Sequence, residues 1–337
     1  MPLTLEDIAH LSGVSRSTVS RVINYDVNVK DETRQKVQQV INSYNFQPNL
    51  AARGLASGRT NVIGVVIPAG VSVIFADPYF PLLLRGISSM CNTRNYSVML
   101  WLAEPEYERR MISRILHNGL VDGVVIASIL IDDPIIQSLI ESKMPFILIG
   151  RHPTIDVNYL DVDNLQSGHK ATAHLIHLGY KRIGTITGSL NQVSGYDRYQ
   201  GYLQALEDSG LPVIPELVAE GSFTEEGGYN AMQHLLKYKP DAVFVASDKM
   251  AYGAMRAVRE AKLRIPEDVA IVGFDDIPAS STTEPPLTTV RQPVLQMGRK
   301  AVDLLIDVIE KGTKSTQKAF LDTELVVRES CGAAKLG

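Results

Sequence analysis

The spacing of hydrophobic positions changes near residue 60 of this 337-residue chain. Before that point apolar residues recur at intervals of three and four. Leu5, Ile8, Ala9 and Leu11 form one such stripe, which predicts a short amphipathic helix. Beyond residue 60, compact runs rich in Val and Ile alternate with longer amphipathic stretches. The change predicts a small all-α segment followed by a larger α/β region.

Two short helices are expected near the N-terminus, separated by one turn. Thr4 is placed to cap the first helix, with Asp7 three residues later as its capping-box partner. Gly13 interrupts the periodicity and suits a tight turn. Ser15 is placed to cap a second helix that runs to Ile23. This arrangement predicts a helix-turn-helix, which sets its second helix into a DNA major groove.

The outward-facing side chains of the second helix suit contacts with DNA. Arg16 and Ser17 lie at its N-terminal end, and Arg21 lies one turn beyond Ser17. Because arginine can hold guanine O6 and N7 with two hydrogen bonds, we expect these three residues to contact base edges. Taken singly, each neighbouring short donor is as well explained as a cap or surface residue, and it is the spaced set that favours DNA. The donors expected at phosphates are Thr4, Ser15, Thr18, Ser20 and Asn24.

Seven apolar runs in the larger region predict buried strands. They lie at 62–67, 96–102, 121–127, 146–149, 182–187, 242–246 and 269–274. Helices are expected between them, among others at 80–91, 195–208 and 250–261. Such alternation predicts parallel sheets with helices on both faces, and the length suits two lobes with separate cores. Ligands of such sheets bind at the carboxyl ends of the strands.

Charge is divided unevenly along the chain. Residues 1–60 carry a net charge of +2, and the remainder carries −6. A mildly basic head on an acidic body fits a protein that meets DNA at one end.

Two segments carry a resemblance to a known family. They are T-L-E-D-I-A-H-L-S-G-V-S-R-S-T-V-S-R-V-I-N at 4–24 and Q-P-N-L-A-A-R-G-L-A-S-G-R at 47–59. Together they resemble the DNA-binding headpiece and hinge of the lactose/galactose repressor (LacI/GalR) family, and the similarity extends to V-V-R-E-S at 326–330. The resemblance implies that Arg16, Ser17 and Arg21 read bases.

The resemblance also implies a hinge helix at 48–58 that forms only when two subunits meet on DNA. Leu55, with Ala52 assigned to the same contact, then enters the minor groove at the centre of a pseudo-palindromic operator. The nine residues from 49 to 57 are too few for a stable isolated helix, and Gly54 weakens it by about 1 kcal/mol relative to alanine. The alternative is a plain linker in which Leu55 is incidental.

Two departures from the family pattern leave alternatives open. Lys30 stands where the family usually has a Ser or Thr cap before its third helix, so either Asp31 takes over the cap or Lys30 reaches a phosphate. The loop at 69–77 is longer than the family's. It either repositions the aromatic residues that follow or adds contacts through Ile74 and Phe75.

The core of the family resembles a type I periplasmic sugar-binding protein. The resemblance implies three crossings between two lobes, which we expect near 161–163, 290–293 and 318–321. We therefore predict an all-α helix-turn-helix headpiece and an α/β two-lobed, periplasmic-binding-protein-like (type I) core with parallel sheets. The expected bounds are 1–46 for the headpiece, 47–60 for the hinge helix or linker, 61–330 for the effector-binding and dimerisation core and 331–337 for a tail. Within the core we expect a first lobe at 61–161 and 292–319 and a second at 162–291 and 320–330.

Carboxylates, an arginine and aromatic rings follow the expected strands, and this is the set of groups that binds sugars. The resemblance implies that Phe80, Arg198, Phe223, Asp248 and Asp275 contact an effector, and that Gln192 and Ser194 help to choose it. Tyr79 is added as an adjacent aromatic. Alternatives remain for single residues, since Asp275 suits a cap and Phe80 suits the core.

Other function classes find little support. The chain has no phosphate-binding G-x-x-x-x-G-K-S/T motif and no dinucleotide fingerprint, so no cofactor is expected. Cys91 and Cys331 lack metal-ligand spacing, and His174 with His177 lacks a third ligand, so no metal is expected. Without a signal peptide or a long apolar segment we expect a cytoplasmic protein with no membrane partner, rather than an exported solute-binding protein. An enzyme using Asp248 with Asp275 as a carboxylate pair is a remote alternative.

The sequence therefore predicts a transcriptional repressor that is not an enzyme. Its expected partners are double-stranded operator DNA, a small effector of the sugar class and a second copy of the chain. A dimer is expected because a two-fold operator requires two headpieces, and no C-terminal leucine heptad indicates a tetramer. A catabolite-control regulator, governed by a phosphoprotein co-regulator, is the alternative.

Overall fold

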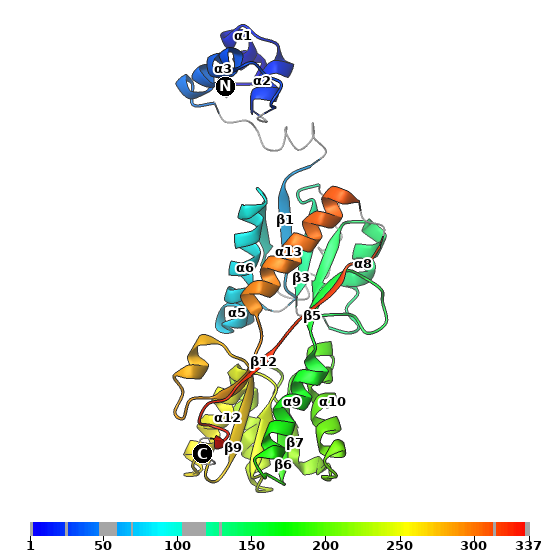
Figure 1. Cartoon of the computed structure of the whole chain (residues 1–337), viewed down its shortest axis with the longest axis vertical. Helices are drawn as coiled ribbons and strands as arrows, with labels where there is room; N and C mark the ends of the chain where they lie inside the picture. The colour runs from blue at the N-terminus through cyan, green and yellow to red at the C-terminus, as the bar shows by residue number, and fades with distance from the viewer. Residues whose placement is uncertain are drawn as a thin grey trace. The chain divides into compact units, whose positions relative to one another are not determined.

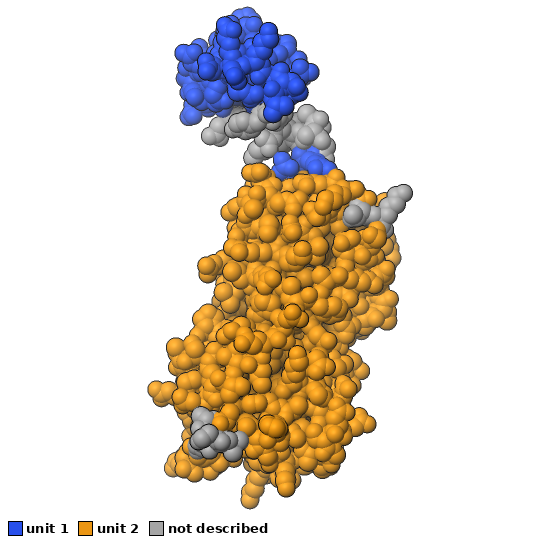
Figure 2. All heavy atoms as spheres, viewed as in Figure 1, with its two compact units in different colours: residues 1–61 blue, residues 62–337 orange. Residues whose placement is uncertain are grey.

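The computed structural model of the chain describes residues 3–23, 26–46, 59–68, 70–102, 119–127, 130–312 and 315–333. The chain divides into two compact units, Met1–Asn61 and Val62–Gly337 (Figure 2). Each unit buries a hydrophobic core of its own, as a separate domain does.

The first unit consists of three helices, α1 (Leu5–Ser12), α2 (Arg16–Ile23) and α3 (Asp31–Ser43) (Figure 1). The predicted capping box is confirmed, since the Thr4 hydroxyl accepts from the Asp7 amide at 3.3 Å and the Asp7 carboxylate accepts from the Thr4 amide at 2.8 Å. Gly13 ends α1 at a φ of 64°, which glycine adopts without strain. The helices bury Ile8, Ala9, Val19, Val22, Val37 and Phe46.

The start of α3 contradicts one of the two alternatives offered for Lys30 and Asp31. The helix begins at Asp31, and Lys30 is its N-cap residue without a side-chain hydrogen bond. The prediction that Asp31 takes over the cap is therefore wrong. Asp31 and Glu32 instead lie in the first turn, where negative charge favours the helix dipole. A phosphate contact by Lys30 stays a prediction.

The second unit contains two six-stranded sheets, each the centre of one lobe. The first lobe's sheet has the order β11-β5-β4-β3-β1-β2, and all its strands are parallel. Its strands are β1 (Val62–Val66), β2 (Ser97–Trp101), β3 (Gly123–Ala127), β4 (Phe146–Ile149), β5 (Tyr159–Val162) and β11 (Lys318–Leu321). Its helices are α5 (Val71–Ala76), α6 (Tyr79–Thr93), α8 (Ile135–Ser142) and α13 (Val294–Lys311).

The second lobe's sheet has the order β12-β10-β9-β8-β6-β7, and only β12 runs antiparallel to its neighbour. Its strands are β6 (Ile183–Thr187), β7 (Val218–Glu220), β8 (Ala242–Val245), β9 (Ala270–Asp275), β10 (Thr288–Arg291) and β12 (Glu324–Val326). Its helices are α9 (Asn164–His177), α10 (Val193–Asp208), α11 (Glu225–Leu236) and α12 (Asp248–Glu260), with short 3₁₀ turns at Pro215–Leu217 and Pro278–Ser281.

Helices cover both faces of each sheet. In the first lobe α6 and α13 pack on one face and α8 on the other (Figure 1). In the second lobe α11 and α12 share one core, and α9 and α10 share the other. The predicted fold class is confirmed, because buried Val- and Ile-rich strands lie in parallel sheets between helical layers.

The chain crosses between the lobes three times, after β5, after β10 and between β11 and β12. The third crossing was expected at 318–321 and the second lobe from 320, but Phe320 and Leu321 pair with Asp161 and Val162 in the first sheet. This part of the prediction is wrong. The short β11 strand alternates exposed and half-buried positions, the pattern of an edge strand, and so lacks a continuous apolar run.

Candidate functional site

The side chains expected to read bases lie on the outer surface of α2. Arg16 and Arg21 keep about two thirds of their side-chain area exposed, at 65% and 64%, and Ser17 is exposed as well. Each arginine has an acidic neighbour, since Arg16 Nε lies 2.9 Å from Glu6 Oε1 and Arg21 Nε lies 3.9 Å from Asp26 Oδ2. Ion pairs as exposed as these contribute little, so both guanidinium groups can change partners readily.

The short donors near α2 have structural roles in the free chain. The Thr4 hydroxyl donates to Asp7 Oδ2 at 2.8 Å while capping α1. The Ser15 hydroxyl accepts from the Thr18 amide at 3.2 Å, as expected of a cap, and lies 2.7 Å from that of Ser17. Ser20 is half-buried. Their phosphate contacts stay predictions, as do the phosphate contact of Asn24 and the minor-groove contacts of Ala52 and Leu55, three residues that lie outside the described ranges.

A cavity of about 310 Å³ lies between the two lobes of the second unit, and both lobes contribute to its wall. Seven of the eight residues expected to contact an effector line it. They are Tyr79, Phe80, Gln192, Ser194, Arg198, Phe223 and Asp275. They come from loops and helix starts that follow parallel strands, where open α/β sheets bind ligands.

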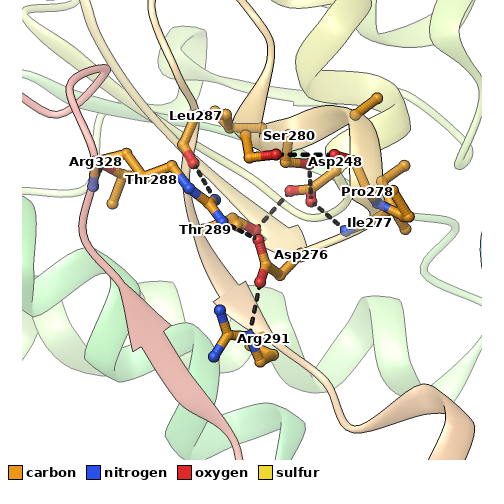
Figure 3. A network of polar contacts seen from close by, with 12 residues as sticks. Asp248, Asp276, Ile277, Pro278, Ser280, Leu287, Thr288, Thr289, Arg291 and Arg328 are labelled. Atoms are coloured by element: carbon orange, nitrogen blue, oxygen red, sulfur yellow. Dashed lines mark hydrogen bonds and ion pairs between the residues drawn. The ribbon is translucent and has the colours of Figure 1, made fainter.

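Asp248 is the exception, and the structure places it outside the cavity wall. Its side chain is fully buried in the second lobe. One carboxylate oxygen accepts from the Ile277 amide at 3.1 Å and the Ser280 hydroxyl at 2.6 Å, and the other accepts from the Thr289 hydroxyl at 2.6 Å (Figure 3). Asp248 therefore anchors the segment after β9 instead of making the predicted effector contact. Its neighbour Ser247, which caps α12, lines the cavity instead.

Arg198 is the central cation of the cavity and is held on several sides. Its Nε donates to Asn164 Oδ1 at 2.9 Å and its Nη1 donates to the Ala246 carbonyl at 2.7 Å. Its guanidinium carbon lies 3.6 Å from the centroid of the Phe274 ring, a cation–π contact. Burial lowers the pKa of Arg198, and Asp275, whose Oδ1 lies 3.8 Å from Nη1, opposes this shift. The side chain is thus preorganised and charged.

Asp275 faces Arg198 from a strained backbone. Its φ is 124° and that of Asp276 is 54°, values that side chains other than glycine rarely adopt. Asp276 is fixed by Arg291 Nε at 2.7 Å and Arg328 Nη2 at 2.6 Å (Figure 3). Burial raises the pKa of Asp275 well above its usual value, although Arg198 lowers it. Gln292 and Arg198 both lie against Oδ1 of Asp275, and the residue lines the cavity.

The first lobe contributes the carboxylates of Asp77 and Asp161 and two aromatic rings. Asp161 Oδ1 accepts from the Val162 amide at 2.8 Å and from Asn164 Nδ2 at 3.0 Å, and burial raises the pKa of Asp161 to about 7. The rings of Tyr79 and Phe80 meet edge to face, 5.5 Å apart. Phe80 belongs to the first-lobe core, as one alternative proposed, and it also lines the cavity, while its effector contact stays a prediction.

The segment expected to be a long loop at 69–77 contains α5. Ile74 is buried in the first-lobe core and Phe75 is 63% exposed, so the prediction that these two add cavity contacts is wrong. Helical spacing directs Val73 to the cavity instead, and Asp77 lines it too. Asp77 Oδ1 also accepts from the Tyr79 amide at 3.0 Å, which fixes the start of α6.

Sequence reasoning missed several polar residues of the wall, among them Asp77, Arg151, Asp161, Asn164 and Gln292. Arg151 comes two residues after the expected strand at 146–149, so the rule of strand ends would have found it. Gln292 donates to Asp275 Oδ1 at 2.6 Å and lies at a crossing between the lobes, which no local pattern indicates.

Further contacts join segments of the first lobe to α10 and the loop before it in the second lobe. Arg151 Nη2 donates to Asp197 Oδ2 at 2.6 Å, and the Ile131 amide donates to the Asn191 carbonyl at 2.7 Å. Within the described ranges, no cluster of His, Cys, Asp or Glu is arranged to hold a metal ion. The helices of those ranges include none long and apolar enough to span a bilayer.

Two sequence families match the chain. Residues 4–49 match "Bacterial regulatory proteins, lacI family", and residues 172–331 match "Periplasmic binding protein-like domain". The regulator CelR of Thermobifida fusca is 40% identical over 332 residues, covering 97% of this chain and 98% of that protein.

Solved structures show the same likeness. A complex of the transcriptional regulator CelR with cellobiose aligns with a TM-score of 0.78 and 38% identity, over 97% of this chain and 99% of that one. The lac repressor dimer bound to operator and an anti-inducer aligns with a TM-score of 0.88 and 29% identity, over 98% and 99%. Similarity thus extends over nearly the whole length of these regulators.

Proposed function

Since the chain belongs to the LacI family of bacterial transcriptional regulators, we propose that it is a repressor that binds a pseudo-palindromic operator as a dimer and is controlled by a sugar in the interlobe cavity. Its close relatives are transcriptional regulators rather than enzymes. Because a two-fold operator has two half-sites, each subunit supplies one headpiece. A regulator of this kind shares a compartment with DNA, so we assign it to the cytoplasm.

The composition of the cavity wall is the observation that carries the sugar assignment. It combines the Arg198 fork, the carboxylates of Asp161 and Asp275, and the rings of Tyr79 and Phe223. Charged forks and carboxylates pair with hydroxyl groups, while rings cover the apolar face of a pyranose. A volume of about 310 Å³ lies within the range of small-molecule sites. Cellobiose, the ligand named for the CelR complex, is the first candidate.

The two-lobed wall also provides a route for control. A ligand that touches Phe80 in the first lobe and Arg198 and Asp275 in the second favours one spacing of the lobes. The ligand shifts the equilibrium between two lobe spacings only by the difference between its affinities for them. The first lobe begins with β1, directly after the hinge segment in sequence. We propose that lobe spacing governs hinge pairing, with Leu55 and Ala52 in the minor groove and Arg16, Ser17 and Arg21 on base edges.

A panel of sugars tests the effector assignment. Purified protein is titrated with cellobiose, lactose, ribose and glucose while thermal unfolding and operator affinity are measured. A ligand at 100 times its Kd adds about 2.7 kcal/mol to the free energy of unfolding, a rise in Tm of several degrees. The effector also changes operator affinity at least fivefold. If no sugar has either effect and a phosphoprotein changes operator affinity instead, the catabolite-control alternative replaces this proposal.

Operator binding is tested separately with a palindromic duplex. Affinity falls steeply with salt, because lysine and arginine release counterions from phosphates. Leu55→Ala weakens operator binding and leaves sugar affinity unchanged. Hydrogen exchange is expected to protect residues 48–57 on operator only, and protection in the free protein contradicts a hinge that folds on DNA.

A further inference from the structure

An ion pair joins the two lobes beside the cavity. Arg151 follows β4 of the first lobe and lines the cavity, and Asp197 lies on α10 of the second lobe. Arg151 Nη2 lies 2.6 Å from Asp197 Oδ2. The side chains are only 29% and 8% exposed, so water screens the pair far less than a surface ion pair.

The surroundings of Asp197 disfavour the ionised form of its side chain. Burial raises its pKa, and the neighbouring charge of Asp163 acts in the same direction, while Arg151 lowers it. Asp197 also acts electrostatically on Asp161 of the cavity wall. Among the described residues, Arg151 is the hydrogen-bond partner that the structure gives this carboxylate. The ion pair with Arg151 thus opposes protonation of Asp197, and the Asp197 carboxylate in turn neutralises Arg151.

Both guanidinium groups of the cavity wall therefore face carboxylates. Arg198 is held by Asn164 and Ala246 and lies 3.8 Å from Asp275. Arg151 is covered by Asp197 from the opposite lobe. The wall carries three further carboxylates of its own, Asp77, Asp161 and Asp275. A ligand phosphate or carboxylate would have to displace Asp197 from Arg151 to reach a free guanidinium group, whereas uncharged hydroxyl groups need no such displacement.

We propose that Asp197 is a specificity-determining residue that makes the cavity select uncharged sugars over phosphorylated or carboxylated ones, by neutralising Arg151 across the lobes. The inference rests on the proposed function, since it concerns the same cavity. It adds that Arg151 is a masked anion-binding group. Removing the charge of Asp197 without changing its shape unmasks that group.

Asp197→Asn is the direct test, and Asp208→Asn is its matched control. Both remove one carboxylate from α10, but Asp208 is exposed, pairs with His169 and lies about 16 Å further along the helix. Calorimetric titrations use two probe pairs at fixed pH and ionic strength, cellobiose with cellobiose 6-phosphate and ribose with ribose 5-phosphate. The quantity compared is the ratio of affinities for the anionic and the neutral probe.

Asp197→Asn is expected to raise this ratio about 10- to 100-fold, the effect of one hydrogen bond to a charged group. Asp208→Asn leaves it unchanged. The double variant Arg151→Met with Asp197→Asn loses the gain, which a general loosening of the lobes would not do.

Three outcomes overturn the proposal. The ratio stays constant in Asp197→Asn, or its gain persists without Arg151, or the unchanged protein prefers the anionic probe while still binding the neutral one. In all three the sugar assignment stands. If the unchanged protein binds no sugar and no sugar alters its operator affinity, the proposed function fails first and this inference falls with it.

Discussion

Helix α2 of the first unit and the wall of the interlobe cavity hold their charged side chains in opposite ways. Arg16 and Arg21 lie within six residues of one helix, and their side chains are 65% and 64% exposed. Arg198 and Asp275 are about 90% or more buried and come from segments more than 70 residues apart. Exposed pairs contribute little to stability, whereas buried charges require fixed partners.

Because of this difference, DNA binding and stability depend on different residues in the first unit, whereas ligand binding and stability depend on the same residues at the cavity. Substitutions on α2 are expected to change DNA binding and leave the fold intact. Substitutions of Arg198, Asp248 or Asp275 are expected to change ligand binding, stability or both, because these side chains in and behind the cavity wall also satisfy buried neighbours. The following changes test this contrast, beginning with the largest expected effect.

Asp248→Ala is expected to destabilise the second unit by about 4 kcal/mol. The substitution leaves the Ile277 amide and the Ser280 and Thr289 hydroxyls without their shared acceptor in a buried site. Urea unfolding followed by circular dichroism measures the loss. A loss below about 1 kcal/mol means that water or a neighbour replaces the carboxylate and that Asp248 is no anchor.

Asp275→Ala is expected to weaken sugar binding by about 3 kcal/mol, or more than 100-fold. Arg198 and Gln292 lose a partner, and ligand hydroxyls lose an acceptor. Operator binding without sugar persists, while the response to sugar disappears. Calorimetry and an operator titration check the two parts. An unchanged response at the same sugar concentration shows that the signal enters elsewhere.

Asp161→Asn is expected to flatten the pH dependence of stability. Because burial raises the pKa of Asp161 to about 7 from its ordinary value of 3.8, the folded chain holds the proton more tightly than the unfolded chain. Stability from this group is therefore present at low pH and lost as pH rises from about 4 to about 7.

Urea unfolding at pH 5 and pH 8 measures the effect. The unchanged protein is expected to lose about 2 kcal/mol more than Asp161→Asn between these values. Burial also raises the pKa of Asp197, Asp248 and Asp275, so the comparison of the two proteins isolates the contribution of one group. If both proteins lose the same free energy of unfolding between these pH values, ionisation of Asp161 does not destabilise the folded chain.

Arg21→Ala is expected to weaken operator binding by about 1–3 kcal/mol and to relax the preference at one base pair per half-site. Stability stays within about 0.5 kcal/mol, since the side chain is 64% exposed. Fluorescence anisotropy with a set of single-base operator variants provides the measurement. An equal loss on every variant identifies Arg21 as a phosphate contact.

Glu6→Gln is the smallest change. It removes the carboxylate 2.9 Å from Arg16 Nε on the surface of the first unit. The free energy of unfolding is expected to change by less than about 0.5 kcal/mol. Operator binding is expected to tighten slightly, because the substitution removes one negative charge that would repel the DNA phosphates. A large loss of stability here contradicts the contrast between the two regions.

The elements that could be predicted are those whose causes are local. Thr4, Asp7 and Gly13 act within three or four residues, so a capping box and a turn are visible in the sequence. Fully buried strands such as β3 and β4 appear as apolar runs, because both of their faces are covered. The half-buried β11 strand and the helix α5 lack such signals and depend on neighbours far away in the chain.

The sequence by itself determined a helix-turn-helix and a two-lobed α/β core, and its resemblance to the LacI family pointed to seven residues of the cavity wall. Tertiary structure alone decided that Ser247 lines the cavity while Asp248 turns into the lobe. It also brought Arg151 against Asp197 across the lobes. Local patterns determine helix caps, the spacing of apolar residues and the ends of buried strands, since each depends on residues close together in the chain. The direction of a side chain at a strand end, and its partner from another lobe, follow from packing between distant segments.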